Sequence, residues 1–103
     1  MYEKIKVIAH INLFEGENMR RTPFLNAYRP VFEFKGAKTK ISARIDLIDE
    51  ENFAPGSSGI VQITFLKGVI SDNYFKKGES FIISEGGKYN LGNGEIIEVI
   101  VNN

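Results

Sequence analysis

The fold class is decided by a stretch near the start of the sequence, residues 4–13, which reads KIKVIAHINL. Its odd-numbered positions carry only apolar side chains, and its even-numbered positions carry mainly polar ones. A period of two places successive side chains on opposite faces of an extended chain. The pattern therefore predicts a β-strand with one buried face and one solvated face.

The same pattern predicts five further strands, separated by turn-forming residues: 31–34, 39–48, 59–66, 81–83 and 96–101. The last three are apolar on both faces, which predicts that each lies between two layers or beneath a partner. Turns are expected at Pro55-Gly56, at Gly78 and at 85–87, and the segment Gly92-Asn93-Gly94 is expected to turn into the final strand. No segment longer than ten residues keeps a helical period, so no helix is predicted.

The composition points the same way. The 103 residues include 14 Ile and 6 Val but only 5 Leu and 5 Ala, together with 8 Phe and 4 Tyr. β-Branched and aromatic side chains suit a pleated, half-buried surface and lose rotamer freedom in a helix. A single domain over 1–103 is predicted, all-β, with about six short antiparallel strands in a small barrel or sandwich.

Several functional classes are disfavoured by the same counts. Thirteen basic and thirteen acidic residues give no net charge, unlike most salt-driven nucleic-acid binders. No phosphate-binding loop of the Gly-Lys-Ser/Thr type is present, and there is no cysteine and only one histidine, His10. We expect no nucleotide, no metal, no cofactor and no membrane insertion. The charged start and the lack of a long apolar run predict a cytoplasmic protein.

One longer stretch resembles a known family. Residues 21–32, RTPFLNAYRPVF, resemble the opening of the third, C-terminal domain of bacterial elongation factor Tu, which reads roughly HTPFFxGYRPQF. Further motifs of that domain follow in order, so the resemblance covers residues from about 3 to 100: 54–56, 61–65, 78–83, 84–88 and 92–97.

The resemblance implies a six-stranded antiparallel, Greek-key-like β-barrel without catalytic residues or a GTPase domain. In the family this barrel packs on two other domains, contacts the nucleotide-exchange factor and helps to hold the T-stem of aminoacyl-tRNA, partly through a Glu-Gly-Gly turn. Here Ser84 and Lys88 stand where the family has arginines on either side of that turn, and four residues, 88–91, stand where it has three. Such an insertion can reverse which side chains face outward.

Two groups of residues are candidate contacts for RNA or a partner. Arg20, Arg21, Thr22 and Arg29 place three cations near one end of the barrel, where they could bind phosphate or an acidic partner. The alternative is a solvated loop in which Arg29 fixes its neighbours through backbone carbonyls or a carboxylate. The second group is the turn Glu85, Gly86, Gly87 and Lys88, which could approach ribose closely or could simply be a hairpin turn that needs positive φ.

Charge is uneven along the chain. Residues 1–44 hold nine basic and four acidic side chains, and residues 45–103 hold four basic and nine acidic ones. This asymmetry predicts either a polarised surface that steers a partner or interleaved strands that neutralise one another. His10 falls on the polar side of its strand, where an exposed position is expected rather than a ligand or base.

The sequence offers no nucleophile and base that could work together, so an enzyme is not expected. The favoured hypothesis is a non-catalytic interaction module that binds a protein partner or self-associates and is connected with translation. The alternative is binding of tRNA or structured RNA through the surface that resembles the T-stem site.

Overall fold

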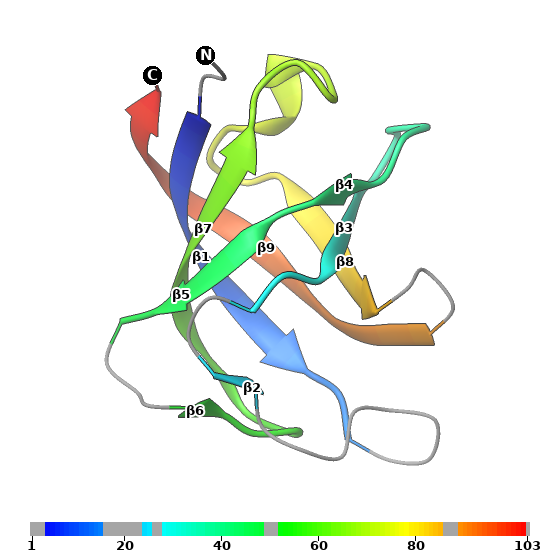
Figure 1. The fold of residues 1–103 in the computed structure, drawn as a ribbon, viewed down its shortest axis with the longest axis vertical. Helices are drawn as coiled ribbons and strands as arrows, with labels where there is room; N and C mark the ends of the chain where they lie inside the picture. Colours follow the sequence, from blue (N-terminus) through cyan, green and yellow to red (C-terminus); the bar gives the residue numbers. More distant parts are fainter. Residues whose placement is uncertain (1–3, 16–23, 26–27, 49–51, 86–88, 103) are drawn as a thin grey trace.

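A computed structural model describes residues 4–15, 24–25, 28–48, 52–85 and 89–102. It contains nine strands and one short 3-10 helix, shown in Figure 1: β1 (Lys4–Leu13), β2 (Phe24–Leu25), β3 (Val31–Phe34), β4 (Ile41–Ser42), β5 (Arg44–Leu47), β6 (Asn52–Phe53), β7 (Ser58–Leu66), η1 (Asp72–Tyr74), β8 (Ser80–Glu85) and β9 (Tyr89–Asn102). The fold is all-β, which confirms the class predicted from the alternating pattern.

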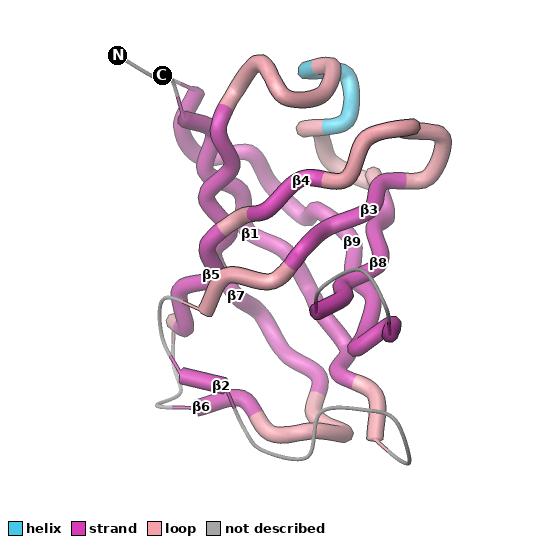
Figure 2. Tube along the Cα trace, turned by 45° about the vertical axis from the view of Figure 1, so that its right-hand side comes forward, coloured by secondary structure: helices cyan, strands magenta, loops and turns pink. Residues whose placement is uncertain are grey.

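Seven strands form one antiparallel sheet in the order β4-β3-β8-β9-β1-β7-β5. Its two edges, β4 and β5, are halves of one segment separated only by Ala43, so the curled sheet closes on itself (Figure 2). Two backbone bonds link the same segment to the residues before β3: Ala43 N–H donates to Pro30 O at 3.3 Å and Ile45 N–H donates to Tyr28 O at 2.7 Å. The sheet thus has one more strand than predicted, because the segment predicted as 39–48 bends at Ala43.

The order of the strands is that of a Greek key. β3, the β4–β5 segment and β7 follow one another along the chain and are neighbours in the sheet, and β8 returns to pair with the other edge of β3. β2 and β6 form a separate two-stranded pair. The first and last strands lie side by side, with Ile5 opposite Asn102.

The interior is lined by the positions that the alternation predicted. All five odd-numbered residues of β1 are at most 3% exposed. Five phenylalanine rings pack around them with centroid separations of 4.9–5.9 Å, in the edge-on and tilted arrangements that aromatic pairs favour: Phe32, Phe34, Phe65, Phe75 and Phe81. The inward side chains of β1 and these five rings therefore belong to one hydrophobic core inside the barrel.

The turn predicted at Gly92-Asn93-Gly94 is wrong. These residues lie within β9, where they pair with Leu13, Asn12 and Ile11 of β1. A Cβ on Gly92 would lie 2.2 Å from the backbone oxygen of Asn12, so glycine is required there because two backbones approach closely. By contrast, Gly56 and Gly78 have φ of 84° and 94°, as turns require.

The longer spacing at 88–91 is absorbed by a bulge. The register of β8 against β9 shifts between Ile83, opposite Gly92, and Ser84, opposite Asn90. Leu91 is left without an opposite residue and is 3% exposed. Ser84, which is opposite half-buried Val31 and exposed Asn90, is itself only 4% exposed, so this position does not present a side chain to a large ligand.

The strands that are apolar on both faces were expected to be covered on both, but the structure covers only the faces that point into the barrel. On β7 the inward residues Val61, Ile63 and Phe65 are fully buried, whereas outward-facing Ile60 is 44% exposed and Leu66 is 40% exposed. β9 likewise leaves Ile97 and Ile100 exposed. No other described element covers these side chains, so apolar surface faces solvent.

Candidate interaction surface

Of the eight residues predicted to make contacts, the structure describes two. Arg29 is exposed and lies just before β3, and Glu85 is exposed at the end of β8. The remaining six, Arg20, Arg21, Thr22, Gly86, Gly87 and Lys88, lie outside the described residues. The two predicted groups are nevertheless joined, because the Tyr28 hydroxyl donates a hydrogen bond to the Glu85 carboxylate. The chain next to Arg29 and the start of the 85–88 turn therefore lie together.

Backbone pairing fixes the position of Arg29. Tyr28 pairs with Ile45 as an isolated bridge, and Pro30 O accepts hydrogen bonds from Ala43 N–H at 3.3 Å and from the Ser42 hydroxyl at 3.4 Å. These contacts hold residues 28–30 along the β4–β5 segment. As a result, Arg29 joins a groove on the outer surface of the barrel instead of remaining with a separate loop.

That groove, of about 520 Å³, brings together four cations. We call it the basic groove, and it is lined by Lys4, Lys6, Arg29, Ser42, Arg44, Asp46, Thr64 and Leu66. The sheet brings these residues together from distant parts of the chain. Lys6 of β1, Thr64 of β7 and Arg44 of β5 are opposite one another and form one row across the three strands. The next row pairs Lys4 of β1 with Leu66 of β7.

The charge in the basic groove is largely uncompensated. The Arg44 Nε–H donates to Asp46 Oδ1 at 2.9 Å, which is the one ion pair within it. The side chains of Lys4, Lys6 and Arg29 have no ion-pair or hydrogen-bond partner among the described residues. Four cations and one carboxylate leave a formal net charge of +3, on a chain whose total charge is zero.

The uneven charge is thus partly neutralised between neighbouring strands and partly gathered in the basic groove. Strands of the basic half alternate with strands of the acidic half, since β1 lies between β7 and β9. His10 is accordingly opposite Glu95, and Ile8 is opposite Glu98. At the start of β1 no acidic side chain of β7 neutralises the two lysines, because Lys4 is opposite Leu66 and Lys6 is opposite Thr64, which are both uncharged.

Beyond the basic groove the same outer face of β1, β7 and β9 carries exposed apolar side chains between polar ones, since Ile8 is opposite Gln62 and Glu98 and Ile60 is opposite His10. Ile60 is 44% exposed and Ile100 is 44% exposed, with Ile97 at 36% and half-buried Ile8 between the two flanking strands. Ile97 and Ile100 are the extra residues of two bulges in β9, at the register shifts against β1. We call these four side chains the isoleucine face.

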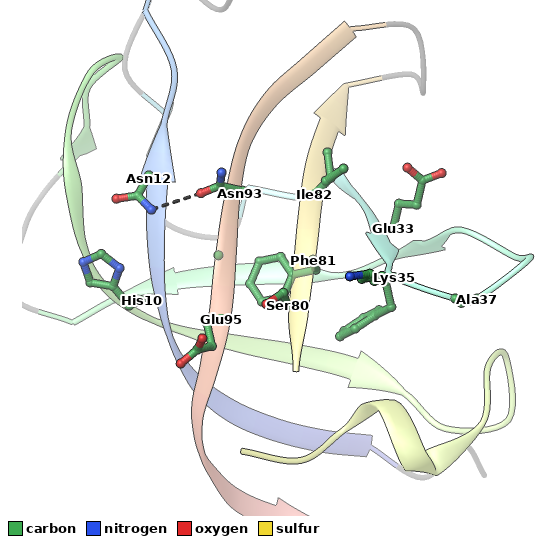
Figure 3. A pocket seen from close by; sticks show the side chains of 13 residues that line it. His10, Asn12, Glu33, Lys35, Ala37, Ser80, Phe81, Ile82, Asn93 and Glu95 are labelled. Carbon is green, nitrogen blue, oxygen red and sulfur yellow. Dashed lines mark hydrogen bonds between the residues drawn. The ribbon is translucent and has the colours of Figure 1, made fainter. Parts of the chain in front are cut away.

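A second hollow of about 760 Å³ lies further along β1, over β9, β8 and β3 (Figure 3). Its polar side chains are spread along the wall and come from four strands and from the turn after β3, which contributes Lys35: His10, Asn12, Glu33, Lys35, Ser80, Asn93 and Glu95. At one end Ser58 Oγ donates to Asn12 Oδ1 at 2.5 Å, and Asn12 Nδ2 donates to Asn93 Oδ1 at 3.0 Å. This chain of hydrogen bonds ties β7, β1 and β9 together across their outer surface.

Sequence reasoning identified Arg29 but missed its companions in the basic groove. Lys4, Lys6 and Arg44 each occupy the polar parity of a predicted strand, which was the available signal. Their proximity depends on β1 and β5 pairing with the two edges of β7: Thr64 is opposite both Lys6, 58 positions earlier, and Arg44, 20 positions earlier. Within the described chain, no group of three or more His, Cys, Asp or Glu residues is placed to hold a metal ion.

No protein-family model matches the chain. In the described part of the structure, no helix is both long enough and apolar enough to cross a membrane.

Proposed function

We propose that this protein is a non-catalytic interaction module whose outer barrel surface binds a protein partner, possible partners including a second copy of the chain. The observation that carries the proposal is the isoleucine face. Three exposed isoleucines and one half-buried isoleucine on three neighbouring strands of one outer face expose more apolar surface than a single side chain would, and exposed apolar surface is typical of sites that another molecule covers. The domain has a complete core of its own, so these side chains are not needed to fill it.

The resemblance to the third domain of elongation factor Tu supports the same function. That barrel packs against other domains and carries no catalytic residues, and the all-β barrel found here is the fold that the resemblance implies. A connection with translation belongs to this proposal. A barrel of this type would work by contact, in the cytoplasm, without nucleotide or cofactor.

The experiment is an affinity capture from native cytosol, analysed for both protein and RNA, together with sedimentation velocity over a range of concentrations. We expect a co-purifying protein or concentration-dependent self-association. The double variant Ile60→Ser/Ile100→Ser should lose this association while remaining folded, because both side chains are exposed.

The matched control is Ile48→Ser/Val69→Ser, which removes two other exposed apolar side chains outside β1, β7 and β9. It should leave the association intact. A strict monomer at high concentration with no co-purifying protein would contradict the proposal. Recovery of RNA alone, released by moderate salt, would favour the alternative of tRNA or structured-RNA binding, for which the cations of the basic groove are the described contacts.

A further inference from the structure

We infer that the basic groove binds an extended, acidic segment of a protein partner that also carries an apolar side chain. This rests on the proposed function as an interaction module and specifies the chemistry of the partner. It concerns other side chains than the isoleucine face, which adjoins the groove at Ile100 beside Lys6, so the two are tested with separate variants.

The first argument is the uncompensated charge. The side chains of Lys4, Lys6 and Arg29 line one groove without partners among the described residues. Arg44 has one partner in the groove, Asp46, and the Arg44 side chain is 44% exposed to solvent. Like charges held on a rigid sheet repel one another, and carboxylates from another molecule would relieve that repulsion. The partner segment must therefore be acidic.

The second argument is the spacing of the cations. Lys4 and Lys6 are two residues apart on β1, so their Cα atoms are roughly 7 Å apart. Lys6, Thr64 and Arg44 lie in one row across three neighbouring strands, which places Arg44 roughly 10 Å from Lys6. Alternate side chains of an extended peptide repeat at the same roughly 7 Å, so acidic residues at every second position match the groove.

The third argument separates a protein from a nucleic acid. Asp46 lies in the groove and accepts hydrogen bonds, and Leu66 at its end is 40% exposed. A peptide offers backbone N–H groups to Asp46 and an apolar side chain to Leu66, whereas the phosphates of RNA have no donor for Asp46 and would be repelled by its carboxylate. The described lining also contains no aromatic ring on which a base could stack. The groove therefore fits an acidic peptide better than RNA.

The test is fluorescence anisotropy with a labelled peptide of about eight residues, in which Glu alternates with Ser around one central Leu. We expect binding at about 50 mM salt that weakens as salt is raised, and no binding of the same peptide with Gln in place of Glu. The triple variant Lys4→Ser/Lys6→Ser/Arg29→Ser should raise the Kd about tenfold, since it removes three exposed charge contacts. Leu66→Ser should raise it about threefold.

The matched control is Lys35→Ser/Lys38→Ser/Lys40→Ser, which makes the same change in net charge on the exposed β3–β4 hairpin. It should change the Kd by less than about twofold. Equal losses in the two triple variants would overturn the inference, because binding would then follow overall charge. Lack of peptide binding at low salt would overturn it as well.

A short RNA duplex provides the remaining arm. If the duplex binds more tightly than the peptide, depends on Lys4, Lys6 and Arg29 and ignores Leu66→Ser, the groove is a phosphate site and the inference is wrong. The proposed function fails by a different result, loss of partner capture, and Ile60→Ser/Ile100→Ser should leave binding of the acidic peptide unchanged.

Discussion

Replacing Gly92 by alanine tests the most informative feature of the barrel, the close contact between β9 and β1. The added Cβ would lie 2.2 Å from Asn12 O, 3.2 Å from Asn12 C and 3.2 Å from Leu13 Cα. All three atoms belong to the backbone of β1, which is held between β7 and β9 and cannot move aside as a flexible side chain could. The strands must therefore separate at this point.

The expected cost follows from that geometry. Inserting a carbon into a tightly packed site typically costs about 1–3 kcal/mol, and a clash with backbone belongs at the upper end, near 3 kcal/mol. A domain of this size has a total free energy of unfolding of roughly 5–15 kcal/mol. The loss corresponds to a fall in Tm of about 12–24 °C.

Urea denaturation followed by circular dichroism, together with a thermal melt, measures both quantities. The matched control is Gly68→Ala, the same chemical change at a glycine with no atom within 4 Å of the added Cβ but with φ of 92°. There only the left-handed backbone conformation opposes alanine, at about 1 kcal/mol.

If residues 92–94 formed a turn with room around them, the order of the two variants would be reversed or lost. At a position with ordinary φ and free space, alanine stabilises a protein by about 0.4–1 kcal/mol because it restricts the unfolded chain. A Gly92→Ala protein as stable as the parent would therefore refute the close approach of β9 and β1.

Three further predictions concern stability. Phe32→Ala should lower the free energy of unfolding by about 3–5 kcal/mol, because the ring is fully buried against Phe65 and Phe81 at centroid distances of 5.3 and 5.2 Å. If urea denaturation showed a decrease below about 1 kcal/mol, this packing would be contradicted. Tyr28→Phe removes the hydroxyl that donates to Glu85 and should lower the free energy of unfolding by about 1 kcal/mol. The control, Tyr74→Phe, should lower it by almost nothing, because the Tyr74 hydroxyl has no hydrogen-bond partner among the described residues. Equal melting temperatures of the two variants would argue against the link between residue 28 and the end of β8. Arg44→Met removes a half-exposed ion pair with Asp46 and should change stability by no more than about 0.5 kcal/mol in a urea titration, so a larger loss would mean that the pair supports the barrel wall.

Several features could be read from local sequence. The alternation in residues 4–13 predicted both the strand and its buried face, since the core positions of β1 follow directly from a period of two. Gly56 and Gly78 were predicted as turn residues and have positive φ. Residues 31–34 were predicted as a strand with the bounds that β3 has. In each case the cause acts over a few neighbouring residues.

Other features depended on strands that are distant in sequence. Gly92 and Gly94 resemble turn residues locally, but the backbone of β1, some 80 positions earlier, is what requires glycine there. The bulge at Leu91 likewise depends on the register between β8 and β9.

Amino-acid order alone thus determined that this chain forms strands, which side of β1 is buried and where the simple turns lie. Only the closed sheet decided which strands became neighbours. That neighbourhood gathers Lys4, Lys6, Arg29 and Arg44 in one groove, although they span 41 positions of the sequence. The physical reason is that local patterns set the direction of a side chain, whereas pairing between distant strands sets what that side chain meets.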